Sequence, residues 1–252
     1  MTQPTGYILY RGPSLLDGSP IVVVATGFKR RSANAKTGDM VQTYILADGI
    51  NPVEAARTGA DAAVCGDCKH RPANGGACYV TLIHGPSAVH RGLVRGIYPV
   101  AQDADAIAQL GAGRMVRLGT YGDPAAVPVG VWEALTRNAE GRTGYTHQWL
   151  NPAISAAQWG RLTALVMASV DSETEAVQAR ANGLRYFRIR TADEPMGPRE
   201  FVCPASEEAG KVRTCATCKA CNGTQGRAGQ ASPVIIVHGT KSARFVAQRS
   251  HA

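Results

Sequence analysis

Seven cysteines, gathered in two tight groups, constrain this chain of 252 residues more than any other feature of its sequence. Three lie in the string CGDCKHRPANGGAC, which starts at Cys65, and four lie between Cys203 and Cys221. The N-terminal residues lack the charged-then-apolar layout of a signal peptide, so we expect a cytoplasmic, reducing location. Clustered thiols in that compartment are expected to bind metal rather than to form disulfides, and an odd number of cysteines agrees with this.

The first group, Cys65, Cys68 and Cys78, has the spacing C-x2-C-x9-C in a glycine-rich loop that also contains His70. Three thiolates on one loop suit a [4Fe-4S] cluster with one iron free of protein ligands, or zinc completed by His70. A CxxC pair alone is a weak signal, and the third cysteine strengthens it. Three buried, reduced cysteines without metal are the alternative.

The second group comprises Cys203, Cys215, Cys218 and Cys221. Two successive CxxC spacings place three thiols on one turn, and Cys203 can fold back as the fourth ligand. Four ligands fill a metal site, so we expect a closed site that holds a second iron-sulfur cluster or structural zinc. The surrounding stretch, 195–232, is rich in Gly, Ala and Cys without periodicity, and a bound metal is expected to order it.

Strand-like and helix-like segments alternate along the rest of the chain. The strand candidates are 21–26, 41–46, 79–83, 96–100, 114–118, 144–149, 165–170, 186–190 and 233–238. The helix candidates are 51–58, 103–110, 129–138, 155–161 and 172–182. Such alternation predicts an α/β protein with βα units around a parallel sheet or partial barrel, in which chemistry takes place at the carboxyl ends of the strands.

This pattern predicts three parts. Residues 1–50 form a β-rich N-terminal segment, 51–194 a (βα) barrel-like core with the three-cysteine loop, and 195–252 a Cys-rich metal-binding extension with a terminal strand and a basic tail. No apolar run is long enough to span a membrane, so no membrane partner is expected. No pattern indicates an oligomeric state.

The net charge of +8, from 27 Lys and Arg against 19 Asp and Glu, favours a polyanionic partner such as nucleic acid or a nucleotide. A basic protein without such a partner is the alternative.

Polar residues at predicted strand ends are the candidates for catalysis. His147 lies in GYTHQW, Asp171 follows the apolar run 165–170, and Gly122 and Asp123 lie in GTYGDP. Each has a purely structural alternative: a packed strand end for His147, a helix cap for Asp171, and an ordinary turn for GTYGDP. Arginines alternate with apolar residues in 186–190, which predicts an amphipathic strand.

The order of these elements resembles the radical S-adenosylmethionine (SAM) enzymes. In that family a three-cysteine loop follows the first barrel strand, an aromatic residue often follows the third cysteine, and a Gly-Gly-Glu-Pro-like turn follows the next strand. Here Tyr79 follows Cys78, and GTYGDP follows the strand 114–118. The family also often has Ser-x-Asp at a later strand end, as in Ser169 to Asp171. The usual family loop is C-x3-C-x2-C, from which this chain departs.

A closer resemblance, over nearly the whole chain, is to the phage gene product eighty-eight family of unknown function. It rests on NAKTG at 34–38, Cys78-Tyr79, Gly122-Asp123, Tyr145-Thr146 and Cys203-Pro204 ahead of CxxCxxC. This resemblance implies a phage origin and therefore a location in the host cytoplasm.

Together the resemblances imply a radical SAM-like iron-sulfur enzyme that modifies a nucleotide or nucleic acid. Tyr79, Gly122 and Asp123 would contact SAM, and Asp123, His147 and Asp171 would be the catalytic candidates. In that family a cubane with an open iron binds the amino and carboxylate groups of SAM and delivers the electron that cleaves it.

Two alternatives remain open. One is a TIM-barrel, transglycosylase-like base-exchange enzyme, with Asp123 or Asp171 as nucleophile and structural zinc at CxxCxxC and His238. The other is a non-enzymatic, metal-stapled protein that binds nucleic acid.

Overall fold

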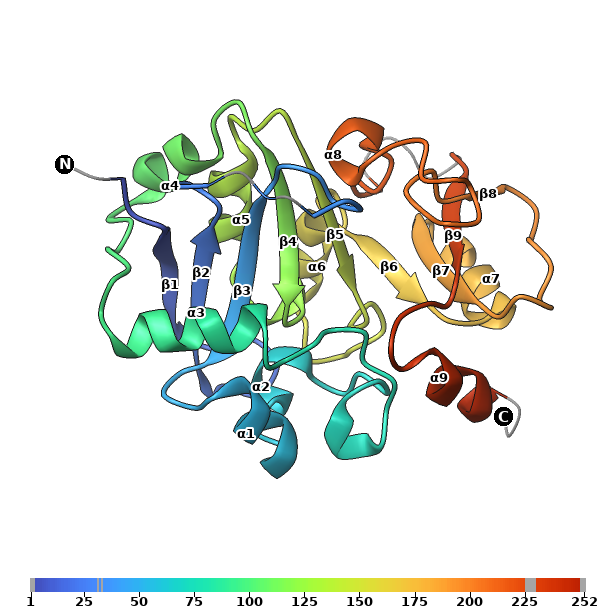
Figure 1. The fold of residues 1–252 in the computed structure, drawn as a ribbon, viewed down its shortest axis with the longest axis horizontal. Helices are drawn as coiled ribbons and strands as arrows, with labels where there is room; N and C mark the ends of the chain where they lie inside the picture. Colours follow the sequence, from blue (N-terminus) through green and yellow to red (C-terminus); the bar gives the residue numbers. More distant parts are fainter. Residues whose placement is uncertain (1–2, 31, 33, 225–229, 250–252) are drawn as a thin grey trace.

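The protein is α/β, built around one mixed sheet (Figure 1). The computed structural model describes residues 3–30, 32, 34–224 and 230–249. Within these residues nine strands pair in the order β1-β2-β3-β4-β5-β6-β7-β9-β8. The outer strands β1 (Gly6–Pro13) and β8 (Glu200–Val202) do not pair with each other in the described part of the chain, so the sheet is open.

The first three strands are antiparallel. β1 pairs with β2 (Pro20–Thr26), and β2 pairs with β3 (Val41–Ala47). Residues 21–25 of β2 are fully buried, because β2 lies inside the sheet and both of its faces are covered. The strands predicted at 21–26 and 41–46 are thereby confirmed.

From β3 onward the strands run parallel to one another in chain order. The series continues with β4 (Met115–Tyr121), β5 (Gly141–Thr146), β6 (Met167–Val170), β7 (Tyr186–Arg190) and β9 (Ser232–Ile236). The short β8 pairs with the far side of β9, also in parallel. The carboxyl ends of these strands therefore meet at one edge of the sheet, which is the lower edge in Figure 1.

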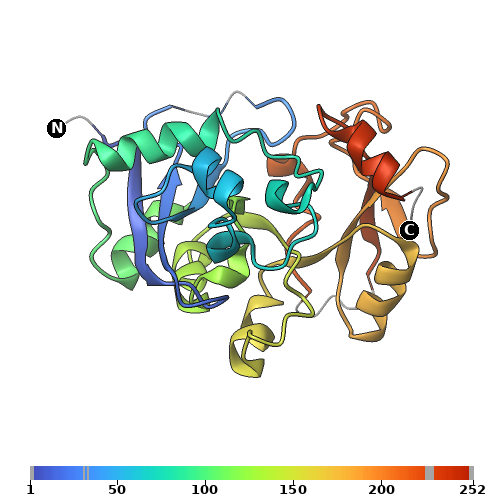
Figure 2. The same ribbon diagram turned by 90° about the horizontal axis from the view of Figure 1, so that it is seen from below.

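Helices cover both faces of the sheet. The described helices are α1 (Pro52–Thr58), α2 (Ala62–Cys65), α3 (Gly85–Val94), α4 (Ala104–Gly111), α5 (Val129–Thr136), α6 (Ala156–Leu162), α7 (Glu173–Ala181), α8 (Cys215–Cys218) and α9 (Ser242–Arg249). Figure 2 shows α5, α6 and α7 on one side of the sheet and α3 and α9 on the other. None of these helices is long and apolar enough to cross a membrane within the described residues.

Capping side chains explain where several predicted helices begin. The Asn51, Asp103, Ser155 and Ser172 side chains each accept a backbone N–H at the start of a helix. Such caps are sequence-local, because the acceptor and the N–H are only two or three residues apart. The five helices predicted from the sequence are therefore confirmed, with ends shifted by a few residues.

Two strand predictions are wrong. The short apolar runs 79–83 and 96–100 are not strands, although Val100 forms an isolated bridge with Ile8. Between them lies α3, which the sequence pattern missed. The basic tail at 241–252 contains α9, because Phe245 provides an apolar anchor that is 4% exposed. Residues 250–252 lie outside the described residues.

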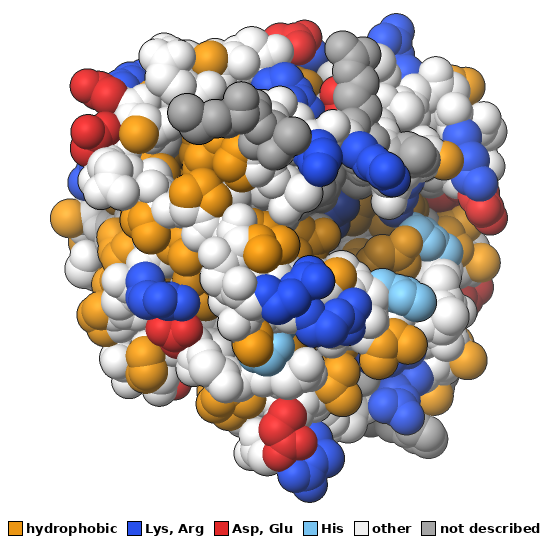
Figure 3. Space-filling model, turned by 60° about the vertical axis from the view of Figure 1, so that its left-hand side comes forward, with side chains coloured by type: hydrophobic (Ala, Val, Ile, Leu, Met, Phe, Trp, Pro, Cys, Tyr) orange, Lys and Arg blue, Asp and Glu red, His pale blue; other side chains and the backbone are white. Residues whose placement is uncertain are grey.

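The chain carries a formal net charge of +8, and Lys and Arg side chains are prominent on one face of the molecule. On the face shown in Figure 3, Lys and Arg side chains lie around a hollow that has hydrophobic side chains in its floor. Histidine side chains also border this hollow. The face thus combines cationic groups with apolar surface.

Candidate functional site

Three polar residues follow consecutive parallel strands and meet at the carboxyl edge of the sheet. Asp123 lies just after β4, His147 after β5 and Asp171 after β6. His70, from the three-cysteine loop, joins two of them: its Nε2 lies 2.7 Å from Oδ2 of Asp171. One ligand atom from each of His70, His147 and Asp171 lies within 4.8 Å of the other two. We call these three residues the His-His-Asp group.

The His-His-Asp group is largely buried. Asp171 is 1% exposed and His70 is 9% exposed. The His70 ring stacks on Phe245 of α9, with the ring centroids 5.7 Å apart. Burial raises the pKa of Asp171, but the hydrogen bond from His70 and the nearby charges of His147 and Lys69 outweigh burial, so this pKa lies below its usual value. Asp171 is therefore held as a carboxylate.

Both carboxylate oxygens of Asp123 accept hydrogen bonds from backbone N–H groups. Oδ1 accepts the N–H of Ala125 at 2.9 Å, and Oδ2 accepts the N–H of His147 at 2.8 Å. Burial raises the pKa of Asp123. The side chain therefore shapes the turn after β4 and fixes the backbone at His147. Its predicted roles as catalytic group and SAM ligand stay predictions.

Gly122 makes the same turn possible. Its φ is +80°, and a Cβ added there would lie 2.6 Å from Cβ of Ile45 in β3. The turn after β4 thus needs glycine for backbone and packing reasons. The N–H of Asp123 also bonds the carbonyl of Val64 at 2.6 Å, which attaches this turn to the residue before Cys65.

The first cysteine group lies beside the His-His-Asp group. Cys65 ends α2, and Cys68 and Cys78 lie in the loop that follows. Burial raises the pKa of all three thiols, to about 12 for Cys68. The backbone N–H groups of His70 and Val80 bond the sulfurs of Cys68 and Cys78 and oppose this increase. Such bonds favour the thiolate, which is the form that binds metal.

The second cysteine group lines one cavity. Cys203, Cys215, Cys218 and Cys221 surround a space of about 30 Å³ together with Lys36 and other residues. The N–H of Ala205 bonds the Cys203 sulfur, and the Tyr145 hydroxyl bonds Cys221. The structure thus brings together the four cysteines that the spacing grouped.

The sulfur positions bear on which metal the two groups fit. Four sulfurs bound to a single tetrahedral zinc lie about 3.8 Å apart, since each Zn–S bond is about 2.3 Å. Across the described residues, no three cysteine sulfurs lie within 4.8 Å of one another, and all seven thiols are free. The described sulfurs therefore do not converge as zinc ligands would, and the choice between zinc and an iron-sulfur cluster stays a prediction.

Backbone contacts hold the second group in place. The N–H of Cys215 bonds the carbonyl of Lys36 at 2.9 Å, and the N–H of Ala216 bonds that of Thr37 at 3.0 Å. On the other side, the buried Arg185 guanidinium donates to the carbonyls of Ala220, Gly223 and Ala231. In the described residues 195–224 and 230–232, protein contacts thus hold part of the chain in place, which the sequence pattern did not indicate; residues 225–229 lie outside the described residues.

A larger cavity, of about 440 Å³, lies next to the four-cysteine cavity. Tyr79, which follows Cys78, lines it, and Lys36 and Ala205 line both this cavity and the four-cysteine cavity. Lys36 Nζ lies 2.7 Å from Nε2 of His238, and the rings of Tyr79 and His238 are 5.0 Å apart. The cavity lining therefore includes an amine, an imidazole and an aromatic ring that lie close to one another.

The ammonium of Lys36 has no carboxylate within ion-pair distance among the residues that the structure describes. Burial lowers the pKa of Lys36 below its usual value. The neighbouring Cys203 and Cys215 oppose part of this decrease. Lys36 lies in the NAKTG motif at 34–38, so the sequence pointed to this segment. No sequence pattern predicted that Lys36 would contact His238.

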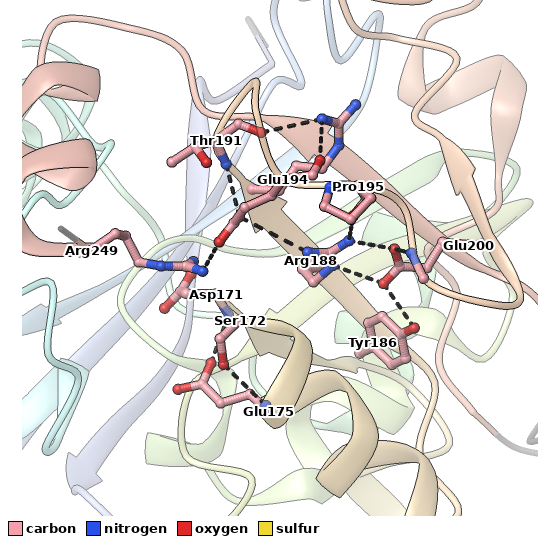
Figure 4. A network of polar contacts seen from close by, with 12 residues as sticks. Asp171, Ser172, Glu175, Tyr186, Arg188, Thr191, Glu194, Pro195, Glu200 and Arg249 are labelled. Carbon is pink, nitrogen blue, oxygen red and sulfur yellow. Dashed lines mark hydrogen bonds and ion pairs between the residues drawn. The ribbon is translucent and has the colours of Figure 1, made fainter. Parts of the chain in front are cut away.

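A buried arginine network lies beyond Asp171 (Figure 4). Arg188 of β7 forms a two-bond ion pair with Glu200 of β8, and their side chains are 2% and 1% exposed. Glu194 bonds Arg249 of α9, which connects the helix over His70 to this network. The predicted amphipathic strand is therefore present, with its arginine face turned into the protein.

Comparisons with protein-family models, curated proteins and solved structures found no match to this chain. What the structure itself defines is an α/β protein with an open mixed sheet, cysteines gathered in two places, and a His-His-Asp group at the carboxyl edge. The resemblances to the phage family and to radical SAM enzymes stay predictions.

Proposed function

We propose that this protein is an iron-sulfur enzyme of radical SAM type, phage-encoded and acting on a nucleotide or nucleic acid in the host cytoplasm. The observation that carries the proposal is the position of Cys65, Cys68 and Cys78. Their loop follows β3, the first strand of the parallel series, and lies at the edge where the following strands present Asp123, His147 and Asp171.

The strand order supports this proposal. Six parallel strands, β3 to β7 and then β9, are neighbours in chain order, as in a (βα) barrel or part of one. A doubly wound sheet would instead reverse its order at a switch point. A partial barrel places its chemistry at the carboxyl ends, where the three-cysteine loop lies. The antiparallel β1 and β2 and the Cys-rich region after β7 are additions at its two sides.

The donor set fits the proposed cofactor. Cys65, Cys68 and Cys78 would hold a [4Fe-4S] cluster, whose open iron binds SAM and whose electron cleaves it. The N–H groups of His70 and Val80 would stabilise the ligating sulfurs, and the turn at Gly122 and Asp123 would border the SAM site. Cys203, Cys215, Cys218 and Cys221 would hold a second, closed cluster.

The 440 Å³ cavity supports a nucleotide-sized substrate, since small-molecule sites usually measure about 300–1,000 Å³. Its Lys36 ammonium would bind a phosphate, and Tyr79 would pack against the base. Because Tyr79 adjoins Cys78, a ligand in this cavity would lie close to the first cysteine group. The basic surface would favour the approach of an anionic substrate.

One observation favours the base-exchange alternative: Asp171 is buried, ionised and has an oxygen without a hydrogen-bond partner. The same alternative requires structural zinc bound by CxxCxxC and His238. This part has less support, because His238 contacts Lys36 and does not line the four-cysteine cavity. We therefore rank it second.

Metal analysis of protein purified without oxygen tests the proposal. The wild type should contain iron and sulfide, and the triple variant Cys65→Ala, Cys68→Ala and Cys78→Ala should lose the oxygen-sensitive part of both while the second site stays filled. Cys218→Ala should give the opposite pattern. Zinc alone at both sites would exclude an iron-sulfur enzyme.

A substitution at Lys36 tests the proposed substrate cavity. Lys36→Met should weaken the binding of nucleoside monophosphates, measured by calorimetry, by about tenfold or more, because it removes the half-buried cation that would bind the phosphate. Lys211→Met is the matched control, since Lys211 lines the same cavity but already pairs with the exposed Glu207 at 2.8 Å. Equal affinity of the wild type and Lys36→Met for the nucleotide would mean that the substrate does not bind at Lys36.

A further inference from the structure

We propose that the His-His-Asp group is a separate binding site for one divalent transition-metal ion, distinct from both cysteine groups. His70, His147 and Asp171 supply two imidazoles and one carboxylate. This donor set binds first-row ions such as Fe²⁺, Mn²⁺ and Zn²⁺ and leaves coordination positions open for other ligands. The inference stands on geometry alone and does not depend on the proposed radical chemistry.

The first argument is convergence. The three side chains come from the cysteine loop, the end of β5 and the end of β6, yet one ligand atom of each lies within 4.8 Å of the others. In the part of the chain that the structure describes, no other His, Cys, Asp or Glu trio meets this distance. The sulfurs of Cys65, Cys68 and Cys78 are outside it, so the group is not an extension of the thiol site.

The second argument is the set of polar atoms that lack a hydrogen-bond partner. Nδ1 of His70, Nε2 of His147 and Oδ1 of Asp171 are all buried and have none. Leaving a buried polar atom unpaired costs about 1–3 kcal/mol, and each of the three residues carries one such atom, so the group has hydrogen-bonding capacity that the protein does not use. A metal ion with its bound water would use that capacity.

The third argument is the support behind the ligands. The backbone N–H of His147 is fixed by Asp123, and the N–H of Asp171 donates to Glu175 at 2.6 Å. The carbonyl of His70 accepts the N–H of Cys78 at 2.9 Å. Metal ligands need such secondary contacts to hold their orientation.

A cation already lies at this site. Lys69 Nζ is 3.1 Å from Oδ2 of Asp171, but its side chain is 53% exposed and also pairs with Glu175 at 2.7 Å. Lys69 can therefore retain one carboxylate partner when a metal ion takes the other. A metal ion would thus compete with this ammonium for Asp171 but not for Glu175.

Titration with Mn²⁺ tests the site, because Mn²⁺ prefers oxygen and nitrogen donors and leaves thiolates largely free. The full-length protein is titrated while the free ion is followed by electron paramagnetic resonance. We expect the wild type to bind one equivalent, and excess Zn²⁺ to displace it, since Zn²⁺ binds such sites more tightly.

His147→Ala and Asp171→Asn should each weaken Mn²⁺ binding by at least about tenfold, as loss of a ligand does. His84→Ala, which changes an exposed histidine at the start of α3, should bind as the wild type does. A wild type that leaves all Mn²⁺ free would overturn the proposal, whether or not the variants fold. Equal binding by the His147 and His84 variants would overturn it as well.

Discussion

Replacing Arg188 by methionine should lower the free energy of unfolding by about 3–5 kcal/mol, the usual cost of removing one partner from a buried ion pair. Arg188 donates to both oxygens of Glu200, at 2.8 and 2.6 Å, and to the carbonyl of Pro195 at 2.8 Å. Without it, the Glu200 carboxylate would stay buried with only the Tyr186 hydroxyl and the Gly197 N–H as partners. Chemical denaturation of both proteins measures the difference.

Arg57→Met is the matched control for this substitution. Arg57 also forms a two-bond pair, with Glu54, but the side chains are 71% and 48% exposed, so its loss should cost at most about 1 kcal/mol. Adding Glu200→Gln to Arg188→Met should recover part of the lost stability, because it removes the unpaired charge. No recovery would mean that packing, rather than charge, explains the cost.

The same pair should make stability depend on pH. Burial raises the pKa of Glu200, but its bonds to Arg188, Gly197 and Tyr186 outweigh burial, so this pKa lies below its usual value. A lowered folded-state pKa contributes stability above the unfolded pKa of about 4.3, and this contribution is lost as pH falls through the folded value. The difference between the wild type and Arg188→Met should therefore shrink in acid.

Much of the fold could be predicted from sequence because it depends on local patterns. Apolar runs mark β2, β3, β6 and β9, period-two alternation marks β7, and capping residues such as Asp103 and Ser172 mark helix starts. The runs 79–83 and 96–100 are also apolar, but 79–83 forms no strand, and 96–100 makes only an isolated bridge to β1. Strand formation there depends on tertiary pairing, which a single segment does not specify.

The site was predictable in part, for the same reason. His147 and Asp171 were identified because they follow apolar strand segments, and parallel strands end at one edge. The partnership of His70 with Asp171 joins residues 101 positions apart, and no local pattern encodes it. Period-two alternation correctly placed Arg188 and Arg190 on one face. The direction of that face depends on Glu200 and Glu208, which lie in a region without periodicity.

If the proposed radical SAM activity is correct, replacing the three cysteines of the loop should abolish SAM cleavage completely. In the triple variant Cys65→Ala, Cys68→Ala and Cys78→Ala, no ligands remain for a cluster with an open iron, while the second cysteine group is intact. We therefore expect no detectable SAM cleavage by this variant, rather than a reduced rate. Cys218→Ala, which alters only the second group, should retain slow cleavage.

Asp123→Ala provides an intermediate test of the turn after β4. If this turn borders the SAM site, the variant should assemble the cluster normally and bind SAM more weakly. Normal SAM binding by this variant would restrict Asp123 to the structural role that its two backbone hydrogen bonds define.

The most direct test of the proposed function is the formation of 5′-deoxyadenosine from SAM by the reconstituted, chemically reduced wild-type protein, quantified by chromatography. The account predicts slow formation of this product even without substrate, and none from the triple cysteine variant. A wild type with a fully assembled cluster that neither binds nor cleaves SAM would contradict the radical SAM assignment.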